Sequence, residues 1–203
     1  MDFSKLLVHL NELSTTHICD AYENARVLGA EIRPISAREK IWGKAFTVSC
    51  EGDLLPVIQA INSAETGSII VINSGNSDRA MLGEIFSTAA QMRNISGMII
   101  DGYCRDAASI RQLSFPVYAR GISPKAGTTQ RTGKLQTSIE CGGVTIFPGD
   151  VIFCDDNGIV ALNETELEKI LPDIIKIIEK ENIAIERIKS GAALTDIFNF
   201  NQQ

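Results

Sequence analysis

The chain has 203 residues, of which 44% are hydrophobic and 22% charged, a composition that suits one well-filled domain over residues 1–203. Its 19 basic and 25 acidic residues give a net charge of −6, which excludes the basic footprint of a nucleic-acid-binding protein. The amino terminus lacks a long apolar core, and the five cysteines are odd in number without a C-x-x-C pair, so we expect no signal peptide, no membrane span and a cytoplasmic protein.

Two helices are expected at the start of the chain. Leucines at helical spacing predict an amphipathic helix within residues 1–13, and residues 14–16 can cap a second helix that runs to about Leu28 and ends at Gly29. The two histidines, at positions 9 and 17, are not part of a metal-type cluster. Zinc chemistry and a Ser-His-Asp triad are therefore poorly supported.

The next segments alternate between strand and helix patterns. We expect a strand at residues 42–50, a helix at 53–65 and a buried strand at 67–73, and Pro56 falls in the first turn of that helix, where proline is tolerated. This order predicts a parallel sheet with helices packed on it.

The central span continues the same alternation. Apolar residues recur at helical spacing in residues 81–92, which predicts a helix whose first turn contains Gly83 and Glu84. A short apolar run at residues 97–101 predicts a buried strand that ends in polar residues, and a helical pattern resumes at 107–113. A helix start and a strand end therefore both present polar groups.

After residue 113 the pattern changes to short strands separated by Gly, Pro and Asp turns, at residues 115–119, 135–140, 144–147, 151–154 and 159–162. We expect them to add a β layer to the parallel sheet. Residues 127–134 approach a phosphate loop but have five residues between the glycines where that motif has four. Residues 155–158 lack the ligand spacing of a calcium loop, and we interpret them as a turn.

A long helix is predicted over about residues 163–190, because an N-cap with acidic first-turn residues precedes it and Gly191 can end it. Its apolar stripe consists of Leu167, Ile170, Leu171, Ile174, Ile178, Ile185 and Ile188. The stripe can pack on the protein's own sheet, or part of it can meet a neighbouring subunit.

Three residues of the central span favour a ligand site. Strand carboxyl ends and helix amino ends converge in open α/β sheets, and the unpaired amides of a helix start attract anions. Gly83 would let the backbone approach an anion, Arg105 supplies a planar fork for a carboxylate, and Asp106 supplies a hard oxygen for a divalent cation. A surface ion pair or a helix cap remains an alternative for the Arg-Asp pair.

The order of these motifs resembles the RraA-like family, which includes class II 4-hydroxy-4-methyl-2-oxoglutarate aldolases that are also oxaloacetate decarboxylases. The resemblance runs from about Thr15 to Leu162 and rests on residues 15–21 (TTHICDA), Gly83-Glu84, 102–106 (GYCRD), 143–150 (GVTIFPGD) and 155–160 (DDNGIV). It implies an α/β fold of the swivelling β/β/α sandwich type, like that of phosphohistidine domains. It also implies a metal-dependent lyase that releases pyruvate from a 4-hydroxy-2-oxo acid.

The resemblance assigns roles to individual residues. It implies that Arg105 and the backbone of Gly83, Glu84, Ile85 and Phe86 bind the pyruvyl moiety, and that Asp106 positions Mg²⁺ or Mn²⁺. Family members form ring-shaped trimers, often paired into hexamers, so a homotrimer or hexamer is expected, with a small 2-oxo acid as substrate and no nucleic-acid or membrane partner.

The family also has a non-enzymatic branch, named for inhibition of ribonuclease E, which typically lacks the aspartate that Asp106 matches. Retention of Asp106 favours the enzyme. Ser109 stands where many of the aldolases carry an acidic residue, which keeps the protein-regulator alternative open. Asp20 lies in the first matching stretch, and we interpret it as structural, with a place at the edge of the site as the alternative.

Overall fold

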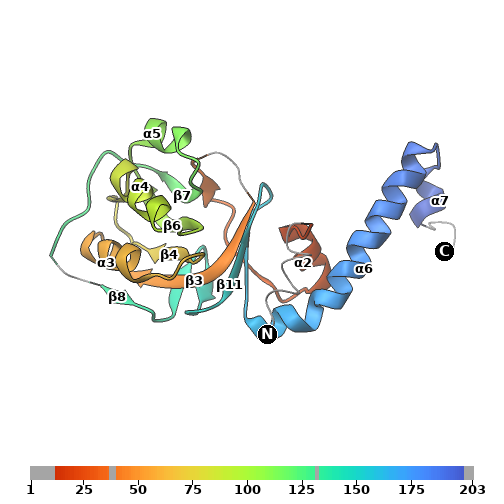
Figure 1. Cartoon of the computed structure of the whole chain (residues 1–203), viewed down its shortest axis with the longest axis horizontal. Helices are drawn as coiled ribbons and strands as arrows, with labels where there is room; N and C mark the ends of the chain where they lie inside the picture. Colours follow the sequence, from red (N-terminus) through yellow and green to blue (C-terminus); the bar gives the residue numbers. More distant parts are fainter. Residues whose placement is uncertain (1–11, 37–39, 131–132, 199–203) are drawn as a thin grey trace. The chain divides into compact units, whose positions relative to one another are not determined.

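A computed structural model describes residues 12–36, 40–130 and 133–198 (Figure 1). The chain divides into two compact units, Ala25–Glu164 and the described parts of Met1–Asn24 with Thr165–Gln203. Most of the opening helix predicted within residues 1–13 falls outside the described residues, as does His9.

The larger unit is built on a ten-stranded sheet in the order β1-β12-β11-β3-β4-β6-β7-β2, with β5 paired to β6 and β8 to β3. The parallel centre consists of β3 (Ile41–Ser49), β4 (Ile69–Asn73), β6 (Gly97–Cys104) and β7 (Val117–Ile122), and β5 (Ala80–Leu82) also runs parallel to β6. The antiparallel strands are β1 (Arg26–Val27), β2 (Arg33–Pro34), β8 (Lys134–Leu135), β11 (Val151–Cys154) and β12 (Ile159–Leu162). The predicted parallel layer is confirmed.

Two hydrophobic cores cover the two faces of this sheet, because successive side chains of a strand point in opposite directions. Ile70 and Ile72 of β4 face a core that includes residues of α3 (Leu55–Ser63), α4 (Glu84–Met92) and α5 (Ala107–Gln112). Ile69 and Val71 face a second core with the hairpin of β9 (Ile139–Cys141) and β10 (Val144–Ile146). Figure 1 shows α3 and α4 together on one face, so the layers are β/β/α.

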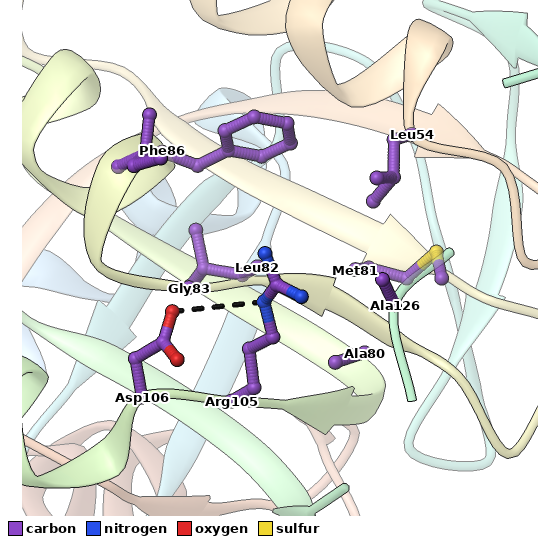
Figure 2. Close-up of a pocket in the computed structure, with 10 residues that line it drawn as sticks. Leu54, Ala80, Met81, Leu82, Gly83, Phe86, Arg105, Asp106 and Ala126 are labelled. Carbon is purple, nitrogen blue, oxygen red and sulfur yellow. Dashed lines mark ion pairs between the residues drawn. The ribbon is translucent and has the colours of Figure 1, made fainter. Parts of the chain in front are cut away.

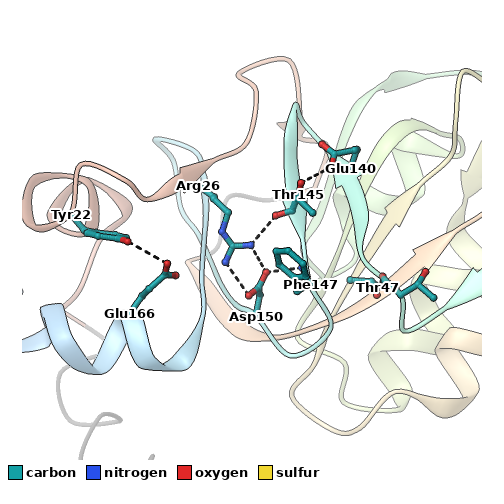
Figure 3. Close-up of polar contacts among 9 residues, drawn as sticks. Tyr22, Arg26, Thr47, Glu140, Thr145, Phe147, Asp150 and Glu166 are labelled. Atoms are coloured by element: carbon teal, nitrogen blue, oxygen red, sulfur yellow. Dashed lines mark hydrogen bonds and ion pairs between the residues drawn. The ribbon is translucent and has the colours of Figure 1, made fainter.

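The smaller unit contains α2 (Thr15–Ala21), α6 (Glu164–Lys189) and α7 (Leu194–Phe198). His17 Nε2 lies 2.9 Å from Glu181 Oε2, and the Tyr22 hydroxyl donates to Glu166 at 3.3 Å (Figure 3). The long helix predicted over residues 163–190 is confirmed as α6. Leu167, Ile170 and Ile174 of its stripe are buried, whereas Ile185 and Ile188 are 46% and 41% exposed.

Tertiary pairing overrides the helical pattern at two predicted boundaries. The second helix was expected to reach Leu28, but α2 ends at Ala21 because Arg26 pairs with β12 and its guanidinium forms an ion pair with the buried Asp150 (Figure 3). The central helix was expected from residue 81, but Met81 and Leu82 lie in β5, and α4 begins only at Glu84. The short elements β1, β2 and α7 were not predicted.

No helix in the described ranges is long and apolar enough to cross a membrane.

Candidate functional site

The site forms where two neighbouring parallel strands end. Leu82 of β5 pairs with Cys104 of β6, so the residues that follow each strand, Gly83 and Arg105, lie side by side. The Arg105 amide donates to the Leu82 carbonyl at 2.9 Å, which fixes this register. The start of α4 and the end of β6 therefore converge, as the sequence predicted.

Gly83 is required by the close approach of the Asp106 carboxylate. A Cβ on Gly83 would lie closer than 3.0 Å to Asp106 Oδ2 and 3.1 Å from Arg105 Cγ. Oδ2 accepts a hydrogen bond from the Glu84 amide at 3.2 Å. Gly83 is the extended N-cap residue of α4, so it lies just outside the first turn, whereas the sequence pattern predicted it within that turn.

Asp106 holds this position through an uncommon backbone conformation. Its φ of 55° and ψ of 38° are left-handed, which aspartate tolerates better than most residues. Asp106 is the N-cap of α5, yet its side chain does not cap α5. It bonds to the first residue of α4 instead.

Arg105 and Asp106 form an ion pair at the mouth of a small pocket, with Arg105 Nε 3.6 Å from Asp106 Oδ2 (Figure 2). Both side chains are 41% exposed, so the pair contributes little to folding. The cavity of about 60 Å³ is lined by Leu54, Ala80, Met81, Leu82, Gly83, Ile85, Phe86, Arg105, Asp106 and Ala126. At roughly 10–15 Å³ per water molecule, this space holds a group of a few heavy atoms, and a larger molecule would extend beyond it.

Of the predicted site residues, Gly83, Ile85, Phe86, Arg105 and Asp106 all line the pocket. Glu84 contributes its amide, and its side chain is exposed beside the site. Leu54 and Ala126 were missed, because they come from distant segments that carry no motif.

The start of α4 can bind an anion. The first amides of a helix have no acceptor within the helix, and the Glu84 amide is already bonded to Asp106. The amides of Ile85 and Phe86 follow at the positive end of the helix dipole. A carboxylate placed here would also reach the Arg105 guanidinium, which is suited to bidentate pairing.

The site can accept a divalent cation through one protein carboxylate. Asp106 Oδ2 is bonded to the Glu84 amide, which leaves the other carboxylate oxygen, Oδ1, for a cation. Among the described residues there is no group of three His, Cys, Asp or Glu side chains that could hold a metal. One carboxylate fits Mg²⁺ or Mn²⁺, because these ions keep several waters and also bind substrate oxygens.

Two other residues near Arg105 and Asp106 have structural roles. Desolvation raises the pKa of the buried Cys104 thiol to about 11, so it is protonated near neutral pH and is not a nucleophile. Asp101 lies on the opposite face of β6, where it accepts hydrogen bonds from Arg120 and, at 2.7 Å, from the Gly142 amide.

Comparison with known proteins identifies a family that matches most of the chain. The family model described as "RraA-like: Aldolase/RraA" matches residues 15–161. An uncharacterized protein of Methanocaldococcus jannaschii is 34% identical over 94% of this chain and 92% of its own length. A protein of Halalkalibacterium halodurans named "Putative 4-hydroxy-4-methyl-2-oxoglutarate aldolase" is 32% identical over 81% of this chain and 80% of its own.

A solved structure of an uncharacterized protein from Pseudomonas syringae pv. tomato superposes with a TM-score of 0.83 at 25% identity, covering 96% of each chain. The fold class predicted from the sequence is confirmed.

Proposed function

The chain belongs to the RraA-like family, and from that membership and its site we propose that it is a divalent-metal-dependent lyase. It cleaves a 4-hydroxy-2-oxo acid, such as 4-hydroxy-4-methyl-2-oxoglutarate, to pyruvate, and it also decarboxylates oxaloacetate. The observation that carries this proposal is the convergence of Arg105, Asp106 and the start of α4 on one small pocket. The name of the Halalkalibacterium relative supports the same reaction class.

The 2-oxo acid binds with its carboxylate at the amides of Ile85 and Phe86 and with its keto oxygen towards Arg105. Retro-aldol cleavage and decarboxylation both leave the enolate of pyruvate, so one site serves both reactions. Arg105 stabilises the negative charge that develops on the enolate oxygen. Retro-aldol cleavage also needs a base for the C4 hydroxyl proton, and Glu84, the exposed first residue of α4, is our candidate.

Asp106 would hold the cation, Mg²⁺ or Mn²⁺, through its Oδ1 atom. When bound, the cation supplies Lewis acidity at the keto oxygen. The Glu84 amide orients the Asp106 carboxylate through Oδ2, so this residue links the cation site to the start of α4.

We also propose that the protein is a cytoplasmic homotrimer or hexamer. Ile85 and Met92 lie seven residues apart on α4, therefore on one face, and are 75% and 77% exposed, and Ile85 also lines the pocket. Burial of this face against a second copy would remove apolar surface from water. Light scattering coupled to gel filtration tests the assembly, and a monomer at micromolar concentration would contradict it.

The activity test measures pyruvate release from both substrates with Mg²⁺ or with chelator, after subtraction of spontaneous decarboxylation. Wild-type turnover should require the metal. Arg105→Lys should lower kcat/KM about 10²-fold because a point charge replaces the planar fork. Asp106→Asn tolerates the left-handed backbone and can still accept from the Glu84 amide, so it should lose metal-dependent turnover while keeping the wild-type melting temperature. Full activity in either variant would remove that residue from the site.

Ser109 in α5 favours a second candidate, a protein regulator of ribonuclease E, because an acidic residue stands there in many of the aldolases. If a folded, oligomeric protein turns over neither substrate, inhibition of ribonuclease E cleavage becomes the assay of choice.

A further inference from the structure

The pocket has two ends of opposite character. Arg105 and Asp106 form its polar end, and Leu54, Met81 and Phe86 form an apolar wall. Figure 2 shows Leu54 and Phe86 on the opposite side of the pocket from the Arg105–Asp106 pair. No charged side chain other than this pair lines the cavity within the described part of the chain.

The apolar wall is held in a fixed position. The Leu54 amide donates to the Thr128 carbonyl at 2.8 Å. Asp53, which is fully buried, accepts from the Leu55 amide at 2.9 Å and from the Thr128 hydroxyl at 3.0 Å. The Asp53 carboxylate thus joins the start of α3 to the loop after β7 and sets where the Leu54 side chain lies.

Packing against Gly127 fixes the same wall from the other side. A Cβ on Gly127 would lie 2.8 Å from Leu54 Cδ2 and 2.8 Å from Met81 Cε, so only glycine leaves room for these two side chains. Phe86 and Leu54 both pack against the larger hydrophobic core. The wall is therefore a preformed surface, as specificity pockets usually are.

We infer, on the basis of the proposed function, that Leu54 and Phe86 are specificity-determining residues that bind the alkyl substituent on C4 of the substrate. The carboxylate and the keto group occupy the polar end, so the chain from C2 through C3 directs C4 towards the apolar wall. A methyl group at C4 would move from water onto the apolar wall, whereas a hydrogen at C4 would leave the wall exposed to water. One methyl group in a hydrophobic pocket changes kcat/KM by roughly 10–200-fold.

The test compares 4-hydroxy-4-methyl-2-oxoglutarate with 4-hydroxy-2-oxoglutarate, which differ only in the C4 methyl. Wild type should favour the methylated substrate at least about tenfold in kcat/KM. Leu54→Ala and Phe86→Ala should each reduce this preference about fivefold or more. Asparagine is similar in volume to leucine, so Leu54→Asn should also reduce this preference while the pocket remains filled. Leu194→Ala is the matched control, because Leu194 is 59% exposed in α7 and outside the pocket.

Oxaloacetate separates failure of this inference from failure of the proposed function, because it carries no C4 alkyl group. If wild type decarboxylates oxaloacetate but shows no preference for the C4 methyl, the inference is wrong and the proposed function stands. A preference that is unchanged in all three pocket variants with wild-type melting temperatures also overturns it. If wild type acts on none of the three substrates, both are wrong.

Discussion

Gly83→Ala tests the geometry of the site most directly. The added Cβ would lie closer than 3.0 Å to Asp106 Oδ2, whereas ordinary contacts begin near 3.4 Å, so the Asp106 carboxylate must move by roughly 1 Å. This movement breaks the bond from the Glu84 amide and shifts Arg105, whose Cγ is 3.1 Å from the new atom. A displacement of this size costs about 10²-fold in kcat/KM.

The cost in stability should be small, because the φ of −150° at Gly83 is extended backbone that alanine adopts without strain. We expect the free energy of unfolding to fall by about 1–2 kcal/mol, mainly through the lost hydrogen bond to a charged acceptor. Pyruvate release measures activity, and thermal unfolding measures stability. Gly158→Ala is the matched control, since a Cβ there meets nothing within 4 Å. Activity within twofold of wild type in Gly83→Ala would refute the close contact.

Other predictions concern the buried polar groups. Asp150 is 3% exposed and accepts hydrogen bonds from Arg26 Nη1 at 2.6 Å and Nη2 at 3.0 Å. Asp150→Ala should therefore lower the free energy of unfolding, measured by urea denaturation, by about 3–5 kcal/mol. A loss under about 1 kcal/mol would contradict this. In native protein near pH 8, a thiol reagent should label at most Cys19, because the other four cysteines are buried, and all five should react after unfolding. Burial raises the pKa of the Cys50 thiol to about 12. The thiol therefore stabilises the fold fully below about pH 9, and this contribution is lost as the pH rises towards 12. In Cys50→Ala, the free energy of unfolding should fall less steeply over this alkaline range than in wild type.

Three strands of the sheet were well predicted from the sequence. β11 and β12 have the predicted boundaries, and β4 lies within its predicted range, because short apolar runs bounded by Gly, Asp or Pro turns have few alternatives. The convergence of the start of α4 with the end of β6 was also predictable in outline, because helix amino ends and strand carboxyl ends meet at one edge of an open α/β sheet.

The pocket wall could not be predicted in the same way. Leu54 lies next to the buried Asp53, which is hydrogen-bonded to the loop after β7, and Ala126 lies in that loop. None of these contacts has a local sequence signature. Met81 and Leu82 continue the helical spacing of α4, yet they form β5 because β6 offers them an edge to pair with. In both cases a contact between distant segments decided the structure.

The Arg105–Asp106 pair contributes little to the stability of the fold, so stability does not explain why it is present. A left-handed non-glycine residue costs on the order of 1 kcal/mol, and an ion pair with both partners 41% exposed contributes at most about as much. The cost of the left-handed backbone and the gain from the ion pair nearly cancel. What the arrangement does provide is a carboxylate held against the Glu84 amide and a guanidinium at the mouth of the pocket. A surface ion pair and a ligand site are therefore compatible descriptions of these residues, and the ligand binding that we propose gives a reason for the left-handed backbone of Asp106.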